Sequence, residues 1–266
     1  MFISRLKKKI NEYLYLHYGI FLLTGRFSFS YYKQLKSDLK KFKFQADQSD
    51  ISFPVKSLYP CYNDASDMAG SITTHYFYQD LYVAQCVFAN CPIKHIDIGS
   101  RVDGFVSHVA SFRPLEVCDI RPLTIPISNV TFTQLDLMDT NSIPANVTDS
   151  ISCLHALEHF GLGRYGDPIN FNGYIVGFNN ISKMLSQGGL FYFSVPIGIQ
   201  RVEFHAHRVF SLKLLLDLIL PKYDILRFSY IDDSIVFHEN VDLTIEQIAN
   251  SFGCVFGCGI FELKKK

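Results

Sequence analysis

From residue 65 onward, the apolar positions alternate between helical spacing and short continuous runs. The helical spacing predicts helices over residues 76–89, 171–186, 211–220 and 244–251. The continuous runs predict buried strands over residues 95–98, 115–119, 130–136, 150–154, 190–196, 223–231 and 255–263. Strands that alternate with helices pair in parallel through crossover connections. The pattern therefore predicts an α/β fold with a doubly wound, mostly parallel sheet.

Three of the predicted strands end in a carboxylate. Asp97 is followed by Gly99, Asp119 closes the second run, and Asp136 closes the third. Because the carboxyl ends of parallel strands meet at one edge of a sheet, we expect these side chains around one crevice. Carboxylates and the free N–H groups of a glycine turn suit the hydroxyls and the amine of a nucleoside. The sequence therefore predicts a nucleoside-binding crevice at this edge.

Length and composition allow one sizeable domain with an appendage. The chain has 266 residues, of which 48% are hydrophobic, with 24 Phe, 15 Tyr and no Trp. We predict a basic, aromatic-rich, helical N-terminal extension over residues 1–65 and an α/β domain over residues 66–266. The seven cysteines are odd in number and lack C-x-x-C spacing, which indicates reduced thiols and a cytoplasmic protein.

Positive charge is concentrated near the N-terminus, although the formal net charge is zero. Residues 1–45 carry ten Lys or Arg against two acidic residues, so the rest of the chain is acidic and nucleic-acid binding is disfavoured. The apolar run at residues 13–23 is too short to span a bilayer, and no A-x-A-like cleavage site follows it. The basic segment fits a peripheral contact with the inner face of a membrane or with a protein. We favour the alternative, a helical cap with a solvated basic face.

The strand ends resemble those of class I S-adenosylmethionine-dependent methyltransferases over roughly residues 90–200. The resemblance is carried by Asp97-Ile98-Gly99-Ser100, Asp119, Asp136 with Leu137, and Leu157-Glu158-His159. It implies a Rossmann-like sheet of seven strands with one strand reversed, and S-adenosylmethionine as the cofactor. The residues that it assigns to cofactor binding are Asp97, Gly99, Ser100, Arg101, Asp119, Ile120, Asp136, Leu137 and His155.

Longer runs resemble a bacterial domain of unknown function that is often encoded among surface-polysaccharide genes. These runs are Tyr76–Leu81, Asp97–Phe105, Asp119–Pro122 and the unusual Glu-His-Phe-Gly-Leu-Gly-Arg-Tyr-Gly-Asp-Pro at residues 158–168. The resemblance implies a sugar or glycan acceptor in cell-surface polysaccharide synthesis. A methyltransferase-like module without catalysis, acting as a binding partner in a polysaccharide-assembly complex, is the alternative.

The turn after the first strand departs from the usual methyltransferase pattern. Arg101 and Asp103 stand where small residues normally let the backbone approach the ligand. Arg101 could pair with the carboxylate at the methionine end of the cofactor. It could equally pair with Asp103 at the surface. The sequence leaves both interpretations open.

Histidines after the fourth and fifth strands are candidates for a general base. Methyl transfer to a hydroxyl needs a group that takes its proton, and His suits this near neutral pH. We expect His207 to be the base, with His159 as the second choice, and Glu158 to face the substrate beside it. Histidines that only hold loops by hydrogen bonds are the competing interpretation.

The run His155-Ala156-Leu157-Glu158-His159 also fits H-x-x-E-H, an inverted zinc-peptidase signature. That chemistry needs both imidazoles on one helical face, four residues apart. His155 directly follows a predicted strand, which disfavours a zinc hydrolase. A divalent ion held by Glu158, His159, Asp167 and His207 is chemically possible, although no spacing requires it.

The loop over residues 161–168 combines three glycines with Arg164, Tyr165 and Asp167. Arg164 could hold a phosphate or carboxylate of the acceptor, and Tyr165 could stack on a sugar ring. Glycines at special dihedral angles in a rigid connection are the alternative. The function that the sequence favours is an S-adenosylmethionine-dependent O-methyltransferase with a sugar or glycan acceptor.

Overall fold

The computed structural model describes residues 29–58, 70 and 72–266, and the chain divides into two units, residues 1–71 and 72–266. The described part of the first unit contains one helix, α2 (Phe29–Ala46), which carries five lysines. The apolar run at 13–23 and the predicted boundary between residues 65 and 66 lie outside the described residues. No helix in the described part of the chain is long and apolar enough to cross a membrane.

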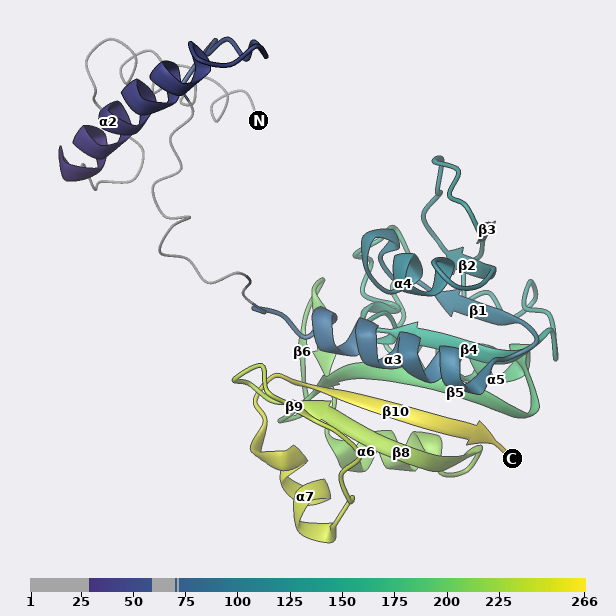
Figure 1. Cartoon of the computed structure of the whole chain (residues 1–266). Helices are drawn as coiled ribbons and strands as arrows, with labels where there is room; N and C mark the ends of the chain where they lie inside the picture. Colours follow the sequence, from purple (N-terminus) through teal and green to yellow (C-terminus); the bar gives the residue numbers. More distant parts are fainter. Residues whose placement is uncertain (1–28, 59–69, 71) are drawn as a thin grey trace. The chain divides into compact units, whose positions relative to one another are not determined.

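An eight-stranded sheet forms the centre of the second unit (Figure 1). Its strand order is β3-β2-β1-β4-β5-β10-β8-β9. The strands are β1 (His95–Ile98), β2 (Leu115–Asp119), β3 (Val130–Gln134), β4 (Thr148–Leu154), β5 (Leu185–Ile197), β8 (Tyr223–Ile231), β9 (Phe237–His238) and β10 (Gly257–Lys265). Strands β1 to β5 are parallel, whereas β10 runs antiparallel to both β5 and β8. The prediction of a mostly parallel sheet is confirmed, but two strands, β10 and the short β9, run against the others where the resemblance implied one.

Helices cover both faces of this sheet (Figure 1). The first face packs against α3 (Tyr76–Asn90) and α4 (Ser107–Ala110), and the other packs against α5 (Gly173–Met184) and α6 (Leu212–Ile219). The strand β5 shows why two apolar layers form, because Phe191 and Phe193 join one layer and Tyr192 joins the other. Burial on both faces explains the continuous apolar runs of the central strands.

Shorter elements complete the unit. They are a π-helical turn (Val102–Val106), a 3-10 turn (Leu157–His159), the hairpin of β6 (Arg201–Glu203) and β7 (His207–Val209), α7 (Ile245–Asn250), and a second 3-10 turn (Ser251–Gly253). Ser211 caps α6 by accepting from the Leu214 N–H, as predicted. Thr244 and Gln247 form a capping box at the start of α7.

Three details differ from the sequence-based prediction. The sheet has an eighth strand, β9, which pairs over only two residues with β8 and is too short to give an apolar pattern. Residues 120–129 and 135–147, both described, connect β2 to β3 and β3 to β4 without a helix. The helix α5 ends at Met184, earlier than expected, because Leu185 already pairs with Thr148 of β4.

Candidate functional site

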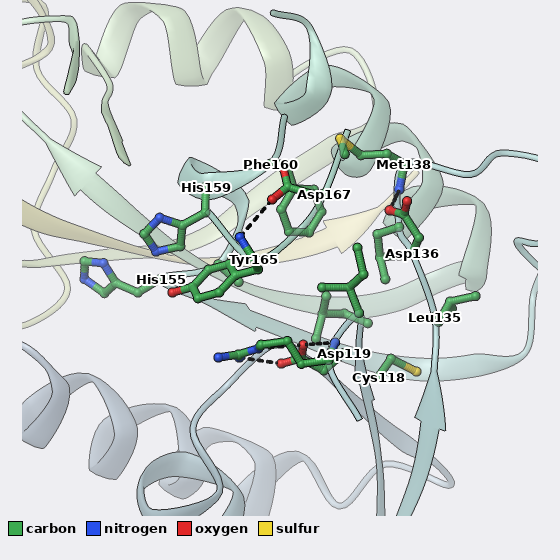
Figure 2. A pocket seen from close by; sticks show the side chains of 16 residues that line it. Cys118, Asp119, Leu135, Asp136, Met138, His155, His159, Phe160, Tyr165 and Asp167 are labelled. Atoms are coloured by element: carbon green, nitrogen blue, oxygen red, sulfur yellow. Dashed lines mark hydrogen bonds and ion pairs between the residues drawn. The ribbon is translucent and has the colours of Figure 1, made fainter. Parts of the chain in front are cut away.

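A narrow cavity of about 60 Å³ opens at the edge where β1, β2 and β4 end. The predicted site residues that line it are Gly99, Asp119, Ile120, Asp136, Leu137, His155, His159, Tyr165 and Asp167. In Figure 2, Asp119 at the end of β2, Asp136 after β3, and His159 and Tyr165 after β4 surround this space. The structure therefore brings together most of the residues expected around one crevice.

Asp97 does not line this cavity. Its side chain is fully buried and accepts hydrogen bonds from the Ser100 N–H (3.1 Å), Ser100 Oγ (2.8 Å) and Ser152 Oγ (2.5 Å). Burial raises the pKa of Asp97 to about 7, against the lowering effect of these donors. Asp97 and Ser100 are therefore engaged with each other, and their bonds hold the turn at Gly99, which needs a positive φ of 71°.

The carboxylate of Asp119 faces the cavity but already has a partner. Arg121 Nε and Nη2 donate to its two oxygens at 3.0 and 2.7 Å, and the Arg121 N–H adds a bond of 2.8 Å. The guanidinium also lies 4.4 Å from the centre of the Tyr165 ring, within reach of a cation–π contact. Arg121 therefore occupies the carboxylate that the resemblance assigns to cofactor binding, and Tyr165 packs on the Arg121 guanidinium.

Asp136 and Leu137 form another wall of the cavity. The Met138 N–H donates to Asp136 Oδ1 at 2.8 Å, which fixes the bend after β3 (Figure 2). Leu137 is buried, and its carbonyl accepts from Asn180 Nδ2 at 2.8 Å. The side chain of Asp136 retains its second carboxylate oxygen for an amine, while Leu137 and Ile120 provide apolar surface.

Glu158 lies between two histidines at the end of β4. Its Oε1 is 2.9 Å from His155 Nδ1 and 3.7 Å from His159 Nε2, and its side chain is 2% exposed. Burial opposes ionisation of Glu158, yet the two histidines, chiefly His155, hold its pKa below the usual range. Burial also opposes charge on His155, but Cys258 and Glu158 raise the His155 pKa well above its usual value. Glu158 is therefore a buried carboxylate paired with His155.

His159 has a defined tautomer. Its Nδ1 donates to the Ala206 carbonyl at 2.6 Å, so Nε2 carries the lone pair when the ring is neutral. Arg164 Nη1 approaches the same Nδ1 at 3.3 Å, but it donates to the Ala206 carbonyl at 3.1 Å, because a protonated Nδ1 cannot accept. Burial lowers the pKa of His159, which favours the neutral ring.

A wider cavity of about 410 Å³ adjoins the narrow one and shares Gly99, Arg121, His155, His159 and Tyr165 with it. Among the residues that line only this second cavity are Arg101, Glu158, Arg164, His207 and Phe256. His207 lies in β7, with Nε2 buried and 3.4 Å from Glu203 Oε2. The candidate bases therefore both face one space, and His159 is the one that also borders the narrow cavity.

Two of the predicted ligand-binding side chains are engaged in local bonds. Arg101 forms a two-point pair with Asp103 at 3.0 and 2.8 Å in an exposed position, as in the surface interpretation. Asp167 accepts from the N–H groups of Gly161, Gly163 and Tyr165, so its carboxylate folds the loop over residues 161–168. Gly161 and Gly163 have positive φ angles, which agrees with a rigid connection.

The geometry does not favour a zinc hydrolase built on residues 155–159. His155 follows β4 with a φ of 49°, and residues 157–159 form a 3-10 turn in place of an α-helix. Both imidazoles face the Glu158 carboxylate and not a common open point. Among the described residues, Glu158, His159, Asp167 and His207 also do not form a cluster with metal-ligand spacing.

Sequence reasoning missed Arg121 as a site residue, although it stands in the quoted run Asp119–Pro122. It also missed Met138 and Phe160, which line the narrow cavity. The sequence feature that could have identified Arg121 is its position two residues after Asp119, because a side chain at this spacing can fold back on the carboxylate. Met138 and Phe160 carry no chemistry that a pattern could reveal.

A family described as "Caenorhabditis protein of unknown function, DUF268" matches residues 127–252, which is less than half of the chain. That description names no reaction and no role in polysaccharide synthesis, and it names Caenorhabditis where the sequence resemblance suggested a bacterial group. No curated protein matches the chain.

Solved structures of methyltransferases share the fold. The 1,6-didemethyltoxoflavin-N1-methyltransferase of Burkholderia thailandensis, crystallised with 1,6-didemethyltoxoflavin and S-adenosylhomocysteine, is 11% identical with a TM-score of 0.51. The match covers 93% of this chain and 95% of that one. The N-methyltransferase NodS of Bradyrhizobium japonicum, with S-adenosylhomocysteine, is 14% identical over 71% of this chain and 85% of its own, with a TM-score of 0.48. The Burkholderia structure, together with the strand order, shows that this chain has the Rossmann-like methyltransferase fold.

Proposed function

We propose that the chain is an S-adenosylmethionine-dependent O-methyltransferase that acts on a hydroxyl of a sugar or glycan intermediate. The observation that carries this proposal is the narrow cavity at the carboxyl edge of a methyltransferase-type sheet. Gly99, Asp119 and Asp136 line it from the ends of three neighbouring strands. Ligands of open α/β sheets bind in the crevice outside these strand ends.

The residues around the cavity fit an adenosyl group. Asp119 offers two carboxylate oxygens for ribose hydroxyls, and Ile120 and Leu137 offer apolar walls for a purine ring. A Cβ added to Gly99 would lie 3.0 Å from Ala156 Cβ, so a larger residue would fill the space beside the turn. The cavity of about 60 Å³ requires Arg121 to leave Asp119 before the nucleoside can enter. When bound, S-adenosylmethionine supplies an electrophilic methyl group.

His159 is the best-placed base in this proposal. The His159 side chain borders both cavities, and its Nε2 carries the lone pair because Nδ1 donates to the Ala206 carbonyl. When Nε2 takes the hydroxyl proton, the imidazolium faces Glu158 Oε1, now 3.7 Å away, and the carboxylate stabilises the new charge. His207 lines only the wider cavity and lies against Glu203, so we assign it to the acceptor side.

The glycan acceptor rests on the sequence resemblance and on the rim of the wider cavity. Tyr165 presents an aromatic ring between Arg121 and Arg164, whose guanidinium carbons lie 4.4 and 5.2 Å from the ring centre. An aromatic face flanked by cationic donors suits a sugar that carries a phosphate or carboxylate. A cytoplasmic site of action agrees with the free cysteines among the described residues, Cys86, Cys91, Cys118, Cys153, Cys254 and Cys258.

Titration calorimetry with S-adenosylhomocysteine tests the cofactor assignment directly. We expect the full-length, reduced protein to bind it, and Asp119→Asn to weaken binding by about 10-fold or more, because hydrogen bonds to charged groups contribute about 1.5–3 kcal/mol. The matched control is Asp103→Asn, which removes an exposed carboxylate outside the narrow cavity. Equal affinity of Asp119→Asn and the wild type would refute the assignment of the pocket.

A non-catalytic binding module is the second candidate. The observation that favours it is the two-point pair of Arg121 with Asp119, which occupies the acceptor in the free protein. If Arg121 does not leave Asp119, titration calorimetry will detect binding of neither S-adenosylmethionine nor S-adenosylhomocysteine. That result would support the binding module and exclude the enzyme.

A further inference from the structure

Three metal-ligating side chains meet beside the wider cavity, from segments far apart in the sequence. His75 precedes α3, His155 follows β4 and Cys258 belongs to β10. One ligand atom of each lies within 4.8 Å of the others, the only such group of three among residues 29–58, 70 and 72–266. Two imidazoles and a thiol are the donor types that zinc prefers.

His155 is already oriented as a metal ligand. Its Nδ1 lies 2.9 Å from Glu158 Oε1, and its Nε2 is buried without a hydrogen-bond partner. The His155 side chain is 7% exposed, so water does not satisfy this nitrogen freely. Metal-bound imidazoles commonly hold a carboxylate on the nitrogen that does not bind the ion. Glu158 occupies that position behind His155.

The other two donors are buried. Cys258 is fully buried, and its thiol makes a long contact of 3.6 Å with Gln79 Oε1 and also interacts with the His155 ring. His75 is 8% exposed, and its ring stacks on His155 at 5.7 Å and on Phe256 at 5.8 Å between ring centres.

We propose that His75, His155 and Cys258 bind a zinc ion, with Glu158 positioning His155 from behind. As the zinc–sulfur and zinc–nitrogen bonds form, the Cys258 thiol and the Nε2 of the charged His155 ring each release a proton to solvent, and the Nδ1 proton stays on the bond to Glu158. Zinc takes four ligands, so one position remains for water or another donor. Because His155 also lines both cavities, the ion would lie next to the candidate methyl-transfer site. Neither the nucleoside pocket nor the base requires this ion.

Cobalt(II) titration of the full-length, reduced, chelator-treated protein tests the site. A thiolate ligand gives cobalt a charge-transfer absorption in the near ultraviolet, and zinc should abolish it by displacement. We expect one equivalent to bind with this absorption in the wild type. Glu158→Gln should keep the absorption and weaken affinity about 10- to 100-fold, as loss of an outer carboxylate partner typically does.

Two cysteine variants make the test specific. Cys258→Ser should lose the charge-transfer absorption, whereas Cys86→Ser, a buried thiol of α3 outside the cluster, should keep it. If Cys258→Ser does not fold, His75→Gln at the start of α3 decides the question, since it should bind cobalt more weakly than the wild type. Absence of cobalt binding in the wild type, or unchanged binding in the Cys258 or His75 variant, would overturn the proposal. Binding of S-adenosylhomocysteine is measured separately, so failure of the zinc site leaves the proposed function untouched.

Discussion

Arg121 controls access to the acceptor at the end of β2. Its guanidinium pairs with Asp119 and lies against Tyr165. In the proposed binding mode, a ribose and Arg121 would compete for the same carboxylate. The side chains of Arg121 and Asp119 are 49% and 14% exposed, and because solvent reaches the Arg121 end of the pair we assign the pair about 0.2–1 kcal/mol. In the proposed binding mode, a nucleoside can therefore displace Arg121 from Asp119.

We predict that Arg121→Gln binds S-adenosylhomocysteine a few-fold more tightly than the wild type. The variant lacks the ion pair with Asp119, so binding no longer has to break an interaction of about 0.2–1 kcal/mol. This free energy corresponds to less than about a 6-fold change in affinity. Titration calorimetry measures the change, and Arg227→Gln is the control, because Arg227 pairs with Glu262 away from both cavities. Weaker binding by Arg121→Gln would instead identify Arg121 as a cofactor contact.

At the residue scale, sequence patterns predicted the members of the site better than their roles. Asp119 and Asp136 were predicted from strand ends, and residues 155–159 were predicted from a motif. Asp97 was misassigned to the crevice, because a pattern cannot tell whether a carboxylate at a strand end turns outward or bonds to Ser100 and Ser152. The His75–His155–Cys258 cluster had no local signal, since its members are 80 and 103 residues apart in the sequence.

At the scale of an element, β1 combines two buried ionisable side chains with opposite pH behaviour. Burial lowers the pKa of His95 to about 3, and its ring nitrogens bond to Ser150 and Ser152. Burial raises the pKa of Asp97 to about 7. Between pH 6.5 and about 3, His95 binds a proton in the unfolded chain but not in the folded chain. The free energy of unfolding that His95 contributes therefore falls as the pH is lowered through this window. The pH dependence that Asp97 contributes has the opposite sign, because between pH 3.8 and about 7 the folded chain holds a proton that the unfolded chain releases. The free energy of unfolding that Asp97 contributes therefore falls as the pH rises.

We predict that Asp97→Asn gains stability relative to the wild type as the pH rises from about 4 to about 7. Across this window the wild type loses up to about 1.4 kcal/mol per pH unit through Asp97, and the variant does not. Urea unfolding at several pH values measures the difference, with Asp217→Asn, exposed on α6, as the control. A pH-independent difference between Asp97→Asn and the wild type would contradict the assigned pKa of Asp97.

The strands were more predictable than the connections between them. Their runs are apolar because both faces of the sheet are covered, and the residues of β8 were predicted without error. The connections from β2 to β4 are irregular, and their folding depends on bonds such as that of Asn180 to the Leu137 carbonyl, which join distant segments. Periodicity contains no information on such bonds.

At the scale of the whole molecule, the second unit contains every part of the proposed chemistry. The two apolar layers, the cavities and the zinc ligands all belong to residues 72–266. The first unit contributes basic charge, of which the described helix α2 carries five lysines against Asp38. The sequence favours a helical cap with a solvated basic face for this extension, and attachment to anionic lipid or to a protein is the alternative that a binding measurement can separate from it.

We predict that residues 72–266 fold alone and bind S-adenosylhomocysteine with the affinity of the full chain. The physical reason is that both apolar layers consist of residues of the second unit, and helices of that unit cover both faces of the sheet. Circular dichroism and calorimetry on the two proteins measure folding and affinity, and Asp119→Asn in the shortened chain shows whether the same pocket is used. Vesicles with anionic lipid provide the complementary measurement, since only the full chain should bind them if the basic segment contacts membranes. A shortened chain that folds but no longer binds the nucleoside would place a necessary ligand contact within residues 1–71.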